Sequence, residues 1–225
     1  MKILALDTST EYLSLALWQD GTVLARDLHA GQRHAELMLP LLGEMLAEAG
    51  LVLKDMDGVA FGAGPGSFTG LRIGCGVAQG LAFGAGLPVV GVGTLLALAA
   101  SSGHDKVIAC IDARMGEVYH AAYVREGAAW QVIHVPGLYA PQDAPLVDGA
   151  GWIGAGSGWL AYPEVLPLRY DGKLRQVMPD VFPHAREIAA LAAPLFVRGE
   201  GQAAAEAAPL YIRNKVALKM SERST

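Results

Sequence analysis

The sequence predicts an α/β protein built from two similar halves. Each half begins with three strand-like runs, and the first run of each half ends in an acid, Asp7 or Asp112. Helical and strand-like segments then alternate, which is typical of layered α/β folds. Of the 225 residues, 52% are hydrophobic and only 17% are charged, so the chain can bury a substantial core.

Three strands are expected at the start of the first half. Residues 2–7 form an apolar run typical of a buried strand that ends at a polar turn. Residues 12–21 alternate in hydrophobicity and stop at Asp20–Gly21, a hairpin signal. Residues 22–31 then supply the third strand of the meander.

A helix is expected from residue 33 to 49, where the apolar spacing changes. Leu37, Leu41 and Met45 fall on one face of it, and Gly50 closes it. The rest of the first half reads as a strand at 58–64, a glycine loop, a helix at 68–85, a strand at 88–93 and a helix at 94–102.

The second half is expected to repeat this order of elements without repeating the residues. The boundary falls near residues 101–105, which divides the chain into halves 1–104 and 105–225, the second more degenerate. Its expected elements are strands at 107–114, 117–127 and 129–135, a strand running into glycines at 151–159, and a helix at 183–196.

Composition limits the functions open to the chain. The net charge is −5 and no basic cluster is evident, which argues against binding nucleic acid alone. The first residues lack the apolar core of a signal peptide. The uncharged stretch 80–100 contains Pro88 and five glycines, so we expect no membrane span and a cytoplasmic protein. Cys75 and Cys110 are expected to be buried thiols.

The glycine-rich segment 61–74 matches neither common phosphate loop. Ser67 replaces the third glycine of the dinucleotide fingerprint, and no lysine is available for a Walker A loop. Two interpretations remain: a tight turn that needs glycine backbone, or an anion site at the N-terminus of the following helix. The candidate residues for phosphate or nucleotide binding in this loop are Gly64, Gly66 and Ser67.

Asp7, Thr8 and Ser9 form a second candidate region. An acid followed by hydroxyls at the end of the first strand is where α/β folds collect nucleotide phosphates or metal-bound water. The alternative is an aspartate that caps its own turn.

The helix after the loop carries two stripes of small residues at four-residue spacing. Each glycine in a helix costs roughly 1 kcal/mol relative to alanine, so the stripes predict close packing against another backbone. The neighbour is either the sheet of the same domain or a second chain. One stripe is Gly70, Gly74, Ala78 and Ala82, and the other is Gly76, Gly80 and Gly84.

No catalytic or metal-binding set can be assembled. His34 could begin a two-histidine pair on one helix face, but Met38 occupies the second position, and a thioether is a poor ligand for hard divalent ions. A serine nucleophile elbow is also missing, since Trp159 stands where its second glycine belongs.

Several motifs together resemble one family. "ILALDTST", "RHAELMLPLL", "FGAGPGSFTGLRIG", "IDARMGEVY" and "PLYIRN" occur in the order and spacing of the bacterial TsaB (YeaZ) family, from residue 1 to about 215. The resemblance implies the fold shared by actin, Hsp70 and sugar kinases (ASKHA), with two βββαβαβα halves.

The resemblance also implies a function. TsaB-like proteins partner TsaD, the enzyme that places threonylcarbamoyl on N6 of adenosine 37 in tRNAs reading ANN codons, with TsaE as the ATPase of the complex. Because Met38 departs from TsaD's metal motif, we expect a non-catalytic subunit without a cofactor of its own, with ATP or ADP and tRNA bound only through the complex. The alternatives are an ATP-dependent phosphotransferase of this fold and an M22-like metallopeptidase.

The helices at 34–49 and 69–84 are expected to form the contact with TsaD, and with a second copy when the chain is alone. The final segment, residues 211–216, is expected to pack back near the first half. The expected contact residues are Leu37, Leu41, Met45, Gly70, Gly74 and Ala78.

Overall fold

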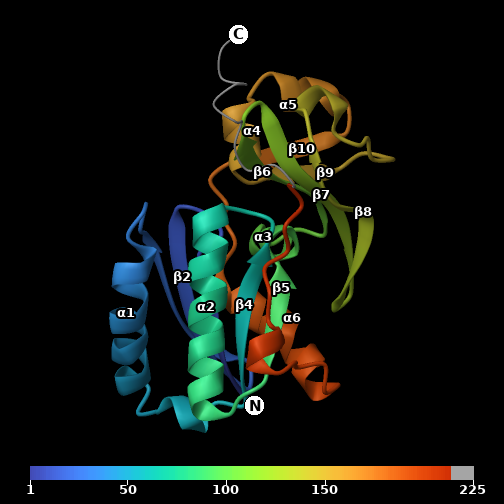
Figure 1. Ribbon diagram of the computed structural model, residues 1–225. Helices are drawn as coiled ribbons and strands as arrows, with labels where there is room; N and C mark the ends of the chain where they lie inside the picture. Colours follow the sequence, from blue (N-terminus) through green and yellow to red (C-terminus); the bar gives the residue numbers. More distant parts are fainter. Residues whose placement is uncertain (214–225) are drawn as a thin grey trace.

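Two five-stranded sheets with the same strand order form the framework of the protein (Figure 1). The computed structural model describes residues 1–213. The first sheet has the order β3-β2-β1-β4-β5, and the second has the order β10-β9-β6-β7-β8. Read from β8 to β10, the second sheet repeats the first, with β6 in the place of β1. In the first sheet β1 pairs with β2 antiparallel and with β4 in parallel, and β6 does the same with β7 and β9.

The strands divide evenly between the sheets. Those of the first sheet are β1 (Lys2–Asp7), β2 (Tyr12–Gln19), β3 (Thr22–His29), β4 (Gly58–Gly64) and β5 (Val89–Gly93). Those of the second are β6 (Lys106–Arg114), β7 (Glu117–Glu126), β8 (Ala129–Tyr139), β9 (Trp152–Ala155) and β10 (Leu174–Met178).

The helices connect and cover the sheets. They are α1 (His34–Glu48), α2 (Phe68–Ala85), α3 (Thr94–Ser101), α4 (Ser157–Ala161), α5 (Val165–Arg169) and α6 (Ala185–Val197). Short 3-10 turns are η1 (Leu53–Asp55), η2 (Pro141–Asp143) and η3 (Ala204–Glu206).

The first half has the expected βββαβαβα order, and the second is a reduced version of it. Where the first half has the long helix α1, the second has only the turn η2, in a connection rich in proline and glycine. Two short helices, α4 and α5, replace a long counterpart of α2. The predicted two-half α/β fold is therefore confirmed, with the second half degenerate.

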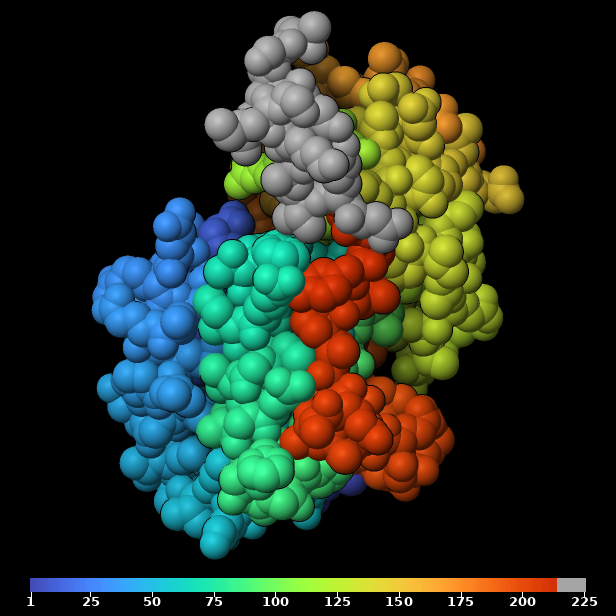
Figure 2. All heavy atoms as spheres, in the orientation of Figure 1, coloured from blue at the N-terminus to red at the C-terminus, as the bar shows by residue number. Residues whose placement is uncertain are grey.

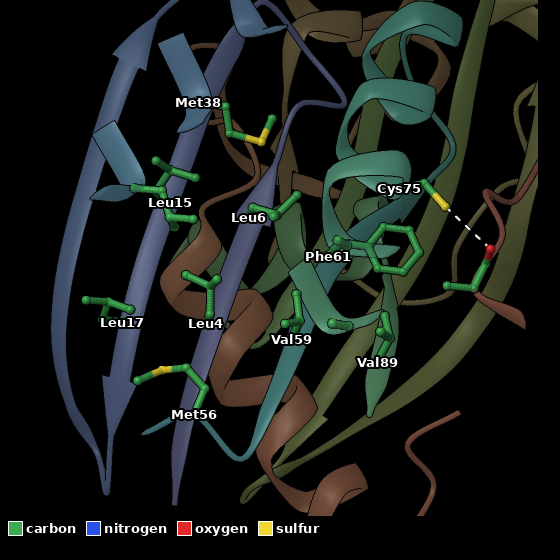
Figure 3. Close-up of a cluster of buried hydrophobic side chains, with 14 of the residues drawn as sticks. Leu4, Leu6, Leu15, Leu17, Met38, Met56, Val59, Phe61, Cys75 and Val89 are labelled. Atoms are coloured by element: carbon green, nitrogen blue, oxygen red, sulfur yellow. Dashed lines mark hydrogen bonds between the residues drawn. The ribbon is translucent and has the colours of Figure 1, made fainter. Parts of the chain in front are cut away.

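Each face of the first sheet is covered by a different part of the chain. Helices α1 and α2 pack on one face, where Leu4, Met38 and Phe61 belong to a common core (Figure 3). Helix α6 packs on the other face through Ile188 and neighbouring alanines. Since α6 follows the second sheet in the chain yet covers the first sheet, a cut at residue 104 does not separate two independent cores. That domain boundary stays a prediction.

The two glycine stripes of α2 face opposite ways. A Cβ on Gly70 would overlap the backbone oxygen of Thr8, and one on Gly74 would lie 2.5 Å from Thr8 Oγ1. Ala78 is fully buried. The prediction that Gly70, Gly74 and Ala78 form a contact surface for another chain is therefore wrong, because they pack against their own sheet.

The other stripe is open. A Cβ added to Gly76, Gly80 or Gly84 would have no neighbouring atom of residues 1–213 within 4 Å. Figure 2 shows helix α2 at the surface along its length, between α1 and the C-terminal part of the described chain. Gly76, Gly80 and Gly84 thus supply the exposed stripe that the sequence could not identify.

The prediction of contact residues on α1 is also corrected in part. Met45 is fully buried in the core below the helix, so it cannot contact a partner. Leu37 and Leu41 are half-buried and pack against the same core, and their role in a contact stays a prediction.

Within residues 1–213, no helix combines the length and apolar character that crossing a bilayer requires.

The opposite environments of the two stripes give a direct stability test. Gly70→Ala should lower the free energy of unfolding by about 2–3 kcal/mol, because its methyl group overlaps the Thr8 carbonyl. Gly80→Ala should raise it by about 1 kcal/mol, because alanine favours the helix and meets nothing. Urea denaturation of both variants beside the wild type measures the difference. Equal shifts in the same direction would contradict this packing.

Candidate functional site

The end of β1 and the glycine loop form one packed junction. Ser67 N donates a 2.7 Å hydrogen bond to the Ser9 carbonyl, and Gly64 N donates to Thr94 Oγ1 at 2.9 Å. A Cβ on Gly66 would overlap the Ser9 carbonyl. The structure therefore brings the candidate residues of the loop and of the β1 turn together.

The polar groups of this junction are used within the chain. Thr8 Oγ1 donates to the Gly70 carbonyl at 2.7 Å, and Ser67 Oγ caps α2 by accepting from Gly70 N at 3.3 Å. An anion cradle needs backbone N–H groups that point to an open space. Since Gly64 N and Ser67 N already have partners, the geometry favours a tight turn over a phosphate loop.

Asp7 is the least satisfied group of the junction. It is fully buried, and its Oδ1 accepts hydrogen bonds from Ser9 N at 3.0 Å and Ser9 Oγ at 2.7 Å. Within the described residues its Oδ2 has no hydrogen-bond partner. Burial raises the pKa of Asp7 to about 6, against the opposing effect of the bonds from Ser9 and the nearby His184.

A cleft between the two halves begins beyond this turn. Tyr12 stacks on Phe182, with ring centroids 3.8 Å apart. The residues that line the cleft include two acids, Glu11 and Asp180, and no lysine or arginine. The lining thus offers no cationic side chain to pair with the phosphates of a nucleotide.

His34 is engaged within the fold. It is buried, and its Nε2 lies 3.2 Å from the Tyr12 carbonyl, while Met38 is fully buried in the core. Residues 1–213 contain no group of three or more His, Cys, Asp or Glu side chains placed to hold a metal ion.

The sequence did not reveal how tightly the last described residues bind the first half. Residues 207–213, here called the strap, run beside α2 toward the second half (Figures 1 and 2). The Ala207 carbonyl accepts from Gln79 Nε2 at 2.8 Å and from the Cys75 thiol, a bond drawn in Figure 3. Leu210 N donates to the Ala63 carbonyl at 2.6 Å.

The far end of the strap reaches the second half. Arg213 forms an ion pair of 2.6 Å with Glu117 and donates to the Arg114 carbonyl in the β6–β7 hairpin. Residues 211–213 therefore lie between the halves. The remainder of the predicted segment, residues 214–216, falls outside the described residues.

The exposed side of α2 forms a continuous surface beside the strap. Phe83 is 82% exposed, an unusual environment for a phenylalanine. The side chains of Ile73 and Val77 are half-buried at its margin. We call this surface the α2 face, and it consists of Ile73, Gly76, Val77, Gly80, Phe83 and Gly84.

The fold and the candidate site together indicate the structural class of the protein. The two halves and their strand order are those of the fold shared by actin, Hsp70 and sugar kinases, but the β1 turn is sealed by the glycine loop. The sequence model of the TsaD family, described as tRNA N6-adenosine threonylcarbamoyltransferase, matches residues 28–144.

Relatives over the whole chain identify the family more narrowly. The tRNA threonylcarbamoyladenosine biosynthesis protein TsaB of Escherichia coli K12 is 40% identical over 97% of both chains. The protein of that name from Haemophilus influenzae is 37% identical over 97% of this chain and 96% of its own. YeaZ from Pseudomonas aeruginosa, a solved structure, is 39% identical and covers 93% of this chain and 99% of its own, with a TM-score of 0.86. The chain belongs to the TsaB (YeaZ) family.

The buried carboxyl of Asp7 predicts a specific pH dependence of stability. The folded state holds this proton up to about pH 6, and the unfolded state releases it near the ordinary aspartate pKa of 3.8, so ionisation destabilises the fold as pH rises between these values. Asp7→Asn keeps the Oδ1 acceptor without the charge. The free energy of unfolding of Asp7→Asn, taken relative to that of the wild type, should be about 1 kcal/mol higher at pH 7.5 than at pH 5. Urea denaturation at both pH values checks this, and a pH-independent difference would contradict it.

Proposed function

We propose that this chain is the non-catalytic subunit of the system that makes threonylcarbamoyladenosine at position 37 of tRNAs reading ANN codons. Its task is to bind and stabilise a TsaD chain through the α2 face. The relatives' names supply the pathway, and the exposed glycine stripe of α2 is the observation that supports the mode of action.

No contact within residues 1–213 explains why the exposed stripe consists of glycines. Three glycines in a helix interior cost about 3 kcal/mol in helix propensity relative to alanine. Gly70 and Gly74 offset their cost by letting the helix approach Thr8, whereas Gly76, Gly80 and Gly84 touch nothing. Glycine stripes of this kind let two helices approach at backbone distance. A second chain seated on α2 would restore the missing packing.

The partner's own fold supports a match between like surfaces. The TsaD family model covers residues 28–144, a span that contains both α1 and α2. A TsaD chain therefore carries counterparts of these helices, and the pair can form a pseudo-two-fold contact. The same geometry permits a homodimer when the chain is alone, in competition with TsaD. TsaE and tRNA would then join the assembled complex.

The candidate site supports a subunit without chemistry of its own. Phosphoryl transfer needs cationic groups beside the phosphates, and the residues that line the cleft include no lysine or arginine. A metallopeptidase needs a second ligand beside His34, whose position Met38 fills. We propose that any ATP or ADP belongs to the complex. One solved structure with a TM-score of 0.87 is described as similar to peptidase YeaZ from P. aeruginosa. That description applies to that protein and is not carried over to this chain.

Substitutions on the α2 face should separate binding from folding. Gly76→Leu and Gly80→Leu fit the open surface of the isolated chain, but they hold a partner helix away. We expect each to weaken TsaD binding by at least about tenfold, with the unfolding midpoint unchanged or raised. Pull-down, size-exclusion chromatography and thermal melting measure these effects.

The matched control is Ala190→Leu, an exposed position on α6 at the other face of the first sheet. It should leave TsaD binding unchanged. Wild-type binding by both glycine variants would place the contact elsewhere. Modification of tRNA or hydrolysis of ATP by the isolated chain, at a rate that TsaD does not raise, would refute the non-catalytic role.

A further inference from the structure

Helix α2 carries one charged side chain, Arg72, and two aromatic rings hold it in place. The guanidinium carbon lies 3.7 Å from the centroid of the Phe68 ring, one turn earlier, and 5.8 Å from that of the Tyr211 ring on the strap. Arg72 Nε donates a 3.0 Å hydrogen bond to the Tyr211 hydroxyl. The long side chain is thereby ordered before any partner arrives.

The position of Arg72 makes it part of the proposed contact. It is exposed and precedes Gly76 by four residues, so the two are neighbours on the helix surface at the border between the α2 face and the strap. With Nε bonded to Tyr211, the guanidinium group presents Nη1 and Nη2. Arg72 is not among the arginines that form ion pairs within residues 1–213. Those that do are Arg26, Arg33, Arg114, Arg125, Arg186, Arg198 and Arg213.

We propose that Arg72 anchors the partner chain by a two-pronged hydrogen bond to an aspartate or glutamate side chain of that partner. This inference rests on the proposed function, since it places the carboxylate on the chain that covers the α2 face. A planar guanidinium with two parallel N–H donors matches a carboxylate, and stacking on Phe68 fixes the plane of the fork. Ordered arginines beside aromatic rings are typical of interface hot spots.

A carboxylate is favoured over an RNA phosphate by the surroundings of Arg72. Binding to nucleic acid depends on several basic groups that neutralise several phosphates. The surface next to Arg72 is instead the uncharged α2 face, which fits a protein helix. The strap takes part as well, because Tyr211 reaches Arg72 only while Leu210 holds the strap to Ala63.

The experiment measures the affinity of the full chain for its TsaD partner at two salt concentrations. Arg72→Gln should weaken binding by about tenfold or more and reduce its salt dependence. Arg72→Lys keeps the charge but loses the two parallel N–H donors of the guanidinium group, and it should bind nearly as weakly as Arg72→Gln. The control is Arg175→Gln, an exposed arginine on the edge strand β10, which should bind as the wild type does.

Tyr211→Phe tests how the anchor is positioned. It keeps the ring and removes the hydroxyl that orients Arg72, so we expect about threefold weaker binding. In the Arg72→Gln background the same change should have no further effect, because the coupled pair is already broken.

The outcomes separate this inference from the proposed function. If Gly80→Leu abolishes binding while Arg72→Gln and Arg72→Lys bind as the wild type does, the anchor is refuted and the α2 contact stands. Wild-type affinity of Arg72→Lys alone also overturns the two-pronged carboxylate. If Arg72→Gln leaves TsaD affinity intact but weakens binding of a tRNA transcript to the assembled complex, the ligand is a phosphate and the inference is wrong.

Discussion

The close approach of helix α2 to the end of strand β1 is the contact on which the rest of the structure depends. At Gly70 and Gly74 the helix backbone comes so near Thr8 that no side chain fits between them. Thr8 Oγ1 bonds the Gly70 carbonyl, and Ser67 N bonds the Ser9 carbonyl. The strand end, the glycine loop and the helix are thus locked as one structural joint.

This joint also fixes the rotation of α2 about its axis. With Gly70 and Gly74 turned toward β1, Gly76 and Gly80 lie about 120° away around the helix axis on average, and they point to the surface. The close packing at Thr8 and the exposure of the second glycine stripe therefore have one cause. A helix that serves the core with one stripe leaves the second for a neighbour.

Much of the fold followed from the sequence, because hydrophobic periodicity and turn residues record local structure. Strand β10 and the short helices α4 and α5 were missed, since their apolar patterns are brief and interrupted by proline and charge. The family was recognised from motifs. The exposed stripe could not be chosen from sequence, because both stripes have the same spacing and only the tertiary contact with Thr8 distinguishes them. The sequence predicted that residues 211–216 pack near the first half, but it did not reveal the strap's hydrogen bonds to Gln79 and Ala63, because these are tertiary contacts.

The strap connects the second half to the surface of α2. Arg213 holds one end of the strap to Glu117 in the second half, and Leu210 holds it to Ala63 beside the glycine loop. Tyr211 lies between these two points and orients Arg72 on α2. The second half, although degenerate, therefore determines the position of a side chain at the border of the α2 face. This contact gives the second half a structural role at the surface of the first.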